Sequence, residues 1–288
     1  MSTPDPSNVL RVHLAPGFPH ADALFPENFA DYAYTESSLD AADVVLKTDG
    51  ADTLVVERRS ELMHLDGVYD FKLPIQGNWH QLPLIVGHIA HFHFFLERMA
   101  GSGSGLTESV QLKMFRVTGE RPDRVADAAY PDFLNNTNSE GGMGIPVARI
   151  PPQADIKYGF EIHNTGTTEI YAYLFYFDPE TYHIFPMHNP HRANRPLTVN
   201  GGVQQIGLGE DPAYEFTPED DKQSNSAFLK LFVSTERLNL DWIQCEGLLE
   251  TGGGVPPGVR PQRTQRKVEM EVRGWDTLTA VVTMTTSG

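Results

Sequence analysis

The sequence predicts a mostly-β, β-sandwich-like fold, an α+β variant with one packed amphipathic helix near 82–99. Short runs rich in β-branched and aromatic residues recur along the chain, and Gly, Pro, Asn and Asp separate them. The segment 82–99 differs, because its apolar residues recur at helical spacing over several turns. With 288 residues, of which 40% are hydrophobic, the chain can also bury a sizeable core.

The N-terminal part of the chain divides into an arm and the start of a domain. Residues 1–40 carry scattered Pro, Ala, Asp and Ser with little periodicity, so we expect an extended arm there. Residues 41–288 are expected to form a single mostly-β domain. If it holds two subdomains, they would divide within the irregular stretch 119–153. Near its start, "DVVLKTDGADTLVVERRS" predicts a hairpin around the turn residues Asp49 and Gly50.

The strongest β signal lies in the middle of the chain. The block "IKYGFEIHNTGTTEIYAYLFYFDPETYHIFPMHN" holds three β-rich runs, 156–163, 168–177 and 182–187, with turn residues between them. The middle run is apolar almost throughout, as expected of a strand covered on both faces. Further strands are predicted at "VQQIGL", "AYEFT", "AFLKLFVST" and the closing "WDTLTAVVTMTT".

The segment "HQLPLIVGHIAHFHFFLERMA" is the predicted helix. Pro83 stands near its start, where a missing N–H costs nothing, and Gly101 stands just past its end. Spacings of three and four residues place five apolar side chains on one stripe: Ile85, Ile89, Phe92, Leu96 and Met99.

Three histidines in this segment raise the question of a metal site. In a helix His88 and His91 share a face, and His93 points about 200° away from His91. Two imidazoles do not close a metal site. In a strand, His91, His93 and Glu97 would be similar to the first metal-binding motif of the cupin barrels, which holds Fe, Mn or Zn. The helix signals favour structural histidines, while a functional histidine on the helix and the cupin-like strand stay open.

Charge and cysteine content exclude several classes of function. The net charge is −16, with 38 acidic and 22 basic residues, which argues against a nucleic-acid partner. No run approaches the ~18 apolar residues of a membrane span and no signal-peptide pattern is present, so we expect no membrane partner and a cytoplasmic, intracellular protein. The single cysteine, Cys245, stands in no nucleophile motif and is expected to be a small buried residue. We predict no catalytic residue.

The turn-rich stretch "HIFPMHNPHRANRP" is the predicted metal locus, if the chain binds a metal. His183, His188 and His191 fall close together there, on turns fixed by Pro186 and Pro190. Three imidazoles suit Zn²⁺ or Ni²⁺. We therefore expect no tightly held cofactor, but weak divalent-metal binding at this loop.

Several segments together carry a family resemblance. They are "KYGFEIHNTGTTEIYAYLFYFDPETYHI", "IGLG", "FLKLFVSTERLNLDWIQ", "ADVVL", "LPLIVGHIAHFHFFLERM", "VQLKMFRV" and "WDTLTAVVT". From about residue 41 to the end, the chain resembles a region of unknown function found C-terminal to caspase-like domains in basidiomycete fungal proteins. In those proteins the catalytic His and Cys belong to the preceding caspase-like domain, so the resemblance implies no catalytic residue here. It also implies a helix at the histidine-rich segment.

These features favour a non-catalytic binding or interaction module that recognises a partner protein or a carbohydrate. An enzyme is less expected, because the sequence has no G-x-S-x-G motif, no phosphate loop and no paired Cys/His motif. Two alternatives stay open. One is a cupin-like metalloenzyme that uses His91, His93 and Glu97, and the other is a regulatory domain of a caspase-like protease system.

Overall fold

The computed structural model describes residues 9–25, 34–50, 52–65, 67–97, 104–135, 144–151, 153, 155–189, 195–216, 224–249 and 274–285. The chain forms two compact units that interleave along the sequence. Unit 1 consists of Met1–Arg98, Phe177–Phe185 and Trp242–Met270. Unit 2 consists of Met99–Tyr176, Pro186–Asp241 and Glu271–Gly288, so the whole stretch 119–153 belongs to it.

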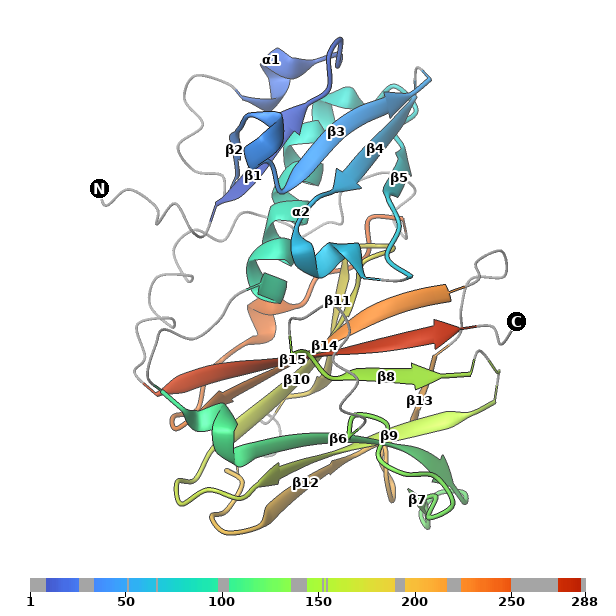
Figure 1. Cartoon of the computed structure of the whole chain (residues 1–288), viewed down its shortest axis with the longest axis vertical. Coiled ribbons are helices and arrows are strands. Elements are labelled where there is room, and N and C mark those ends of the chain that lie inside the picture. The colour runs from blue at the N-terminus through green and yellow to red at the C-terminus, as the bar shows by residue number, and fades with distance from the viewer. Residues whose placement is uncertain are drawn as a thin grey trace. The chain divides into compact units, whose positions relative to one another are not determined.

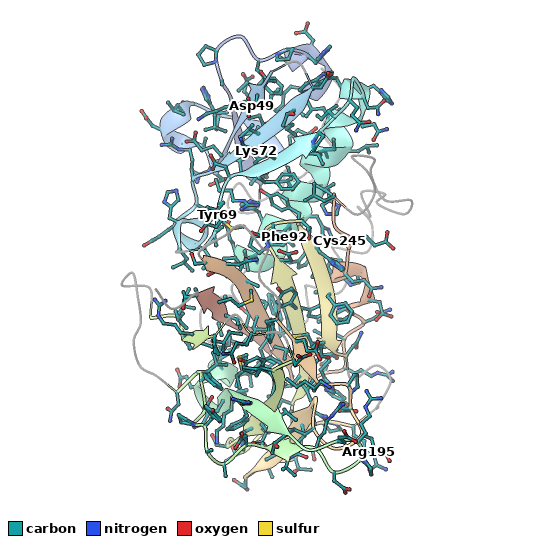
Figure 2. All side chains as sticks on the ribbon, turned by 90° about the vertical axis from the view of Figure 1, so that its right-hand side faces the viewer. Asp49, Tyr69, Lys72, Phe92, Arg195 and Cys245 are labelled. Atoms are coloured by element: carbon teal, nitrogen blue, oxygen red, sulfur yellow. The ribbon has the colours of Figure 1, made fainter. Side chains whose placement is uncertain are left out.

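Unit 1 contains a five-stranded sheet and the longest helix of the described ranges. The strand order is β2-β1-β3-β4-β5, in which β1 runs parallel to β2 and β3 and the other neighbours are antiparallel. The strands are β1 Leu10–Leu14, β2 Tyr34–Glu36, β3 Val44–Asp49, β4 Thr53–Arg58 and β5 Phe71–Pro74 (Figure 1). The hairpin predicted around Asp49 and Gly50 is confirmed, since Asp49 pairs with Thr53 where β3 meets β4. Lys72 of β5 reaches the carboxylate of Asp49 at 3.1 Å on an exposed part of this sheet (Figure 2).

The described N-terminal residues belong to this sheet, so the extended arm expected over 1–40 is wrong for them. β1 lies between β2 and β3, and the short helix α1 (Ala21–Leu24) follows it. Leu10 and Val12 are buried. Five residues of alternation in "LRVHL" are too few to stand out from the surrounding Pro and Asp, and the strand is held by pairing with distant residues.

The helix predicted near 82–99 is confirmed as α2, Leu82–Glu97. Met99 and Gly101 lie outside the described residues, and the other four residues of the predicted stripe are fully buried: Ile85, Ile89, Phe92 and Leu96. Ten of the 16 residues are buried, among them His88 and His93. The helix is therefore covered around much more of its circumference than a single apolar stripe would require.

Unit 2 is built around two sheets, and the predicted β-sandwich-like arrangement is confirmed. One sheet has the order β11-β10-β14-β15-β8; the other has the order β12-β9-β6-β7, with β13 also paired to β9 (Figure 1). A single hydrophobic core takes Met114 and Phe160 from one sheet and Leu174 and Leu231 from the other. The strands are β6 Val110–Thr118, β7 Val125–Ala126, β8 Val147–Ile150, β9 Lys157–Asn164, β10 Tyr171–Asp178, β11 His183–His188, β12 Gly202–Ile206, β13 Tyr214–Glu215, β14 Ser224–Ser234 and β15 Trp275–Thr285. Residues 177–178 of β10 and 183–185 of β11 belong to unit 1.

The strand predicted to be covered on both faces is β10. Leu174 and Phe175 point to opposite faces, and both are fully buried. The closing strand β15 is also paired, antiparallel to β14 over its whole length and parallel to β8.

No helix in the described ranges is both long enough and apolar enough to cross a bilayer. The 3-10 helices among the described residues are Leu39–Ala41, Glu61–His64, Trp79–Gln81, Leu106–Ser109 and Asp241–Ile243.

Replacing Phe92 (Figure 2) tests the packing of α2. Its ring is fully buried, with centroids 5.3 Å from that of Phe177 and 5.0 Å from that of Tyr182. Phe92→Ala should lower the free energy of unfolding by roughly 3–5 kcal/mol, as measured by urea denaturation. Phe94 is partly exposed on the same helix. Phe94→Ala should cost less than half as much, and equal losses would contradict this packing.

Candidate functional site

Tyr182 is contacted by three polar side chains of unit 1, those of Arg58, His88 and Cys245. Its side chain is fully buried and its backbone has φ 58°, a left-handed conformation that bulky residues rarely adopt. Such a conformation costs on the order of 1–3 kcal/mol and persists only where the surroundings fix it. The ring packs edge-on against Phe71 and Phe92, with centroids 4.9 and 5.0 Å away.

Arg58, at the end of β4, binds the phenol of Tyr182 and two backbone carbonyls. Its Nε donates to Oη of Tyr182 at 3.1 Å, and its two terminal nitrogens donate to the carbonyl oxygens of Tyr69 and Pro179. The guanidinium also lies 4.9 Å from the centroid of the Tyr182 ring. Burial raises the pKa of Tyr182, so the phenol stays neutral. Arg58 thus holds the turn before β11 in unit 1, using the several donors of its planar head group.

Two histidines of α2 bind backbone carbonyls in unit 1. Nε2 of His88 lies 2.9 Å from the carbonyl oxygen of Tyr182, and Nε2 of His91 lies 2.9 Å from that of Ile243. A neutral imidazole that donates from Nε2 leaves Nδ1 as an acceptor. In His88 that Nδ1 is buried and has no hydrogen-bond partner among the described residues. Both histidines tie the helix to other segments of the unit.

The cupin-like strand hypothesis is wrong for His91, His93 and Glu97, because all three lie on α2. Nδ1 of His93 lies 3.3 Å from Oε1 of Glu97, one helical turn away. His91 directs its Nε2 to a backbone carbonyl instead. Within the described part of the chain, no three or more His, Cys, Asp or Glu side chains are grouped so that they could hold a metal ion.

Cys245 also contacts Tyr182. Its backbone forms an isolated bridge with Ile184, and its Sγ lies 3.5 Å from the carbonyl oxygen of Tyr182. Burial raises the pKa of the Cys245 thiol to about 12. Because the thiolate is the reactive form, this thiol is a poor nucleophile at neutral pH. Cys245 is half-buried, which is less than the full burial that the sequence predicted for it.

The predicted histidine metal locus lies partly on a strand. His183 and His188 are the first and last residues of β11, whereas the sequence indicated a turn-rich loop at His188. Side chains an odd number of residues apart in a strand point to opposite faces. Burial lowers the pKa of His188. His191 lies outside the described residues, so a three-histidine site stays a prediction.

The terminal strands of the three sheets differ in how their free backbone groups are protected. Such strands expose unpaired N–H and C=O groups, and proteins protect them with short strands, charged residues or Pro. β2 and β7 are only three and two residues long. The longer strands β5, β8 and β11 carry Lys or Arg, Pro, or both: Lys72 and Pro74 in β5, Arg149 in β8 with Pro151 directly after it, and Pro186 in β11.

β12 lacks these protections. Its five residues, "GVQQI", contain neither a charged residue nor Pro, and the chain is uncharged from Pro196 to Gly209. Val203 is 45% exposed. β12 ends its sheet, with β9 on one side (Figure 1). No strand in the described ranges pairs with its other side.

The antiparallel pattern identifies the backbone groups that face this free edge. The N–H of Thr165 donates to the carbonyl of Ser109, so every second residue of β9 bonds to β6. The alternate residues of β9 bond to β12 instead, and their partners there are Gly202, Gln204 and Ile206. The N–H and C=O groups of Val203 and Gln205 therefore point outward. The side-chain amide of Gln204 donates to the outward carbonyl of Gln205 at 2.8 Å.

A row of polar side chains lies beside this edge on the outer face of the sheet. Glu161 of β9 accepts hydrogen bonds from Nε2 of Gln205 at 3.1 Å and from Nε2 of His163 at 2.9 Å. The register places Val203 opposite His163. The sequence predicts the strand "VQQIGL" but does not indicate that it ends a sheet; its long uncharged stretch is the signal that could have done so.

No family model, curated protein or solved structure matches the chain. The resemblance to the fungal caspase-associated region therefore stays a prediction.

Replacing His88 tests how this buried imidazole makes stability depend on pH. Burial lowers the pKa of His88. In the unfolded chain this histidine should protonate near the usual pKa of ~6.5, whereas in the folded chain it protonates only at a lower pH. The free energy of unfolding should therefore fall as the pH decreases from the unfolded pKa to the folded pKa. His88→Gln keeps a donor for the carbonyl of Tyr182 but does not titrate. It should lose less stability than wild type between about pH 7.5 and about pH 5.5 in urea denaturation.

The matched control is His80→Gln, because His80 is exposed. This variant should follow the wild-type pH dependence. If His88→Gln and wild type lose equal stability over the same interval, the buried imidazole does not contribute to the pH dependence as we expect.

Proposed function

We propose that this protein is a non-catalytic interaction module that binds an extended polypeptide strand along the free edge of β12. The observation that carries the proposal is the unprotected edge itself. Of the terminal strands that the structure describes, β12 is the one that is longer than three residues and has no charge or Pro to prevent pairing. Unprotected edges are templates for strand addition by another chain.

The backbone of β12 supports this mode of binding. In strand addition, main-chain hydrogen bonds supply affinity and alternate side chains supply specificity. Val203 and Gln205 each present one outward N–H and one outward C=O, which matches the two-residue repeat of an incoming strand. A carbohydrate has no such repeat of alternating donors and acceptors, so the edge favours a protein partner.

The side chains beside the edge support specific recognition. An incoming strand would place every second side chain on the outer face, next to the exposed Val203. Glu161 and the side chains of Gln205 and His163 already form hydrogen bonds with one another there. Their positions are set before binding, which reduces the ordering cost of association. The side chains that an incoming strand places opposite Val203 and Gln205 should therefore decide which sequences bind.

The contacts in unit 1 fit a module without catalysis. Arg58, His88 and Cys245 contact the backbone or ring of Tyr182, and these contacts stabilise its left-handed conformation. These three side chains thus serve the fold of unit 1.

Peptide selection against the full chain tests the proposed function. A phage-displayed random peptide library should yield extended, β-branched peptides that bind wild type in the micromolar range, on the order expected for a small interface. Val203→Pro removes an outward N–H, a position where an edge strand tolerates Pro. This variant should lose the peptides, whereas Ala126→Pro, which removes an outward N–H at the opposite edge of the same sheet, should retain them.

Peptides that bind Val203→Pro as well as wild type would contradict the proposal. Binding of an immobilised polysaccharide with no dependence on β12, in place of any peptide, would instead identify a carbohydrate ligand and overturn it.

A further inference from the structure

We infer that the strand added to β12 comes from a second copy of this chain, so that two copies join by antiparallel β12–β12 pairing centred on Gln204. This inference rests on the proposed function, because it names the partner of the same edge. It is supported by the alternation of outward-facing backbone groups along β12, by its side chains and by the charge distribution around it.

The outward-facing backbone groups of β12 can pair with the same groups of a second β12. With Gln204 opposite Gln204 of the second copy, Val203 stands opposite Gln205 of the second copy. Both are outward-facing residues, so each such pair exchanges two hydrogen bonds and the two-fold axis generates two pairs. A shift of one residue would set outward groups against inward ones. The amide of Gln204 would leave the carbonyl of Gln205, which would accept a backbone N–H of the second copy instead.

The side chains of β12 are also compatible with this register. Residues directly opposite lie on the same face of a sheet. Val203, 45% exposed, would contact the aliphatic part of Gln205 of the second copy. Ile206 would stand opposite Gly202, which adds no side chain to collide with it. Gly202 is itself required, since a Cβ there would lie 2.4 Å from the carbonyl oxygen of Thr198.

The charge distribution makes β12 the place where two copies can approach. Each chain carries a net charge of −16, so two copies repel one another. The uncharged stretch Pro196–Gly209 brings no like charges into the contact. The remaining repulsion is long-range, and salt screens it over a Debye length of ~8 Å at 0.15 M. Association should therefore strengthen as salt is added, whereas binding of a basic partner would weaken.

The strength of the contact follows from its length. Pairing of two five-residue strands is a small interface, below the ~1,200 Å² of standard protein–protein interfaces. We expect a concentration-dependent dimer with a Kd in the micromolar range or weaker.

Analytical ultracentrifugation of the full chain tests dimer formation. The wild-type dimer fraction should rise with protein concentration and again when NaCl is raised. Val203→Lys should abolish the dimer, because a lysine on an edge strand opposes pairing. Val125→Lys is the matched control: it makes the same substitution at a residue that is 56% exposed on β7, the opposite edge of the same sheet. This variant should dimerise as wild type does.

Cysteine cross-linking tests the register. In the inferred pairing the Cα atoms of the two Gln204 residues form a non-hydrogen-bonded pair ~4.5 Å apart, within the range of disulfides. Gln204→Cys should form a disulfide-linked dimer under mild oxidation. Gln205→Cys should react much more slowly, because its two thiols would lie diagonally. Cys245 contributes little, since burial raises its pKa to about 12.

The outcomes separate the inference from the proposed function. A wild-type chain that stays monomeric at every concentration and salt, or a dimer that persists in Val203→Lys, overturns the inference. Equal cross-linking of the two cysteine variants overturns the register. If the chain is monomeric while selected peptides still require an intact β12 edge, the inference fails and the proposed function holds. If neither dimer nor peptide depends on β12, both fail.

Discussion

Backbone N–H and C=O groups at the edges of the three sheets are the ones that this mostly-β fold leaves without a strand partner. Inside a sheet each strand pairs on two sides, but a terminal strand pairs on one. In this protein most terminal strands are short or carry charge or Pro, which leaves their free groups to water. β12 combines five residues of regular ladder with an uncharged sequence and an exposed Val203. Its outward groups are the ones best placed to bind another chain, and both the proposed function and the inferred dimer depend on them.

Unit 1 shows how polar residues stabilise a conformation that the chain would not adopt alone. Tyr182 has a left-handed backbone and a buried phenol, both of which are unfavourable without partners. Arg58 binds the phenol and His88 binds the carbonyl. Residues often associated with catalysis thereby stabilise one turn, and burial of the His88 imidazole, which lowers its pKa, should make that stability depend on pH.

The sequence predicted those elements that depend on neighbouring residues, through hydrophobic periodicity or turn residues. The helix at 82–97 and the hairpin at Asp49 and Gly50 follow from periodicity and turn chemistry, and both are confirmed. The strand β1 was missed because it depends on distant partners, β2 and β3. The same limit applies to the candidate site. The strand at "VQQIGL" is readable from the sequence, whereas its terminal position depends on the order of strands in the sheet. The partners of the α2 histidines, Tyr182 and Ile243, are also set by contacts far apart in sequence.

Amide hydrogen exchange, resolved by residue with NMR, tests the central claim most directly. At low protein concentration the N–H groups of Gln204 and Ile206, which bond to β9, should exchange slowly, and those of Val203 and Gln205 should exchange fast. As concentration and salt rise, Val203 and Gln205 should gain protection while Gln204 and Ile206 change little. Equal, strong protection of all four amides in the dilute protein would mean that the outer edge of β12 is already paired within the chain, and would contradict the account.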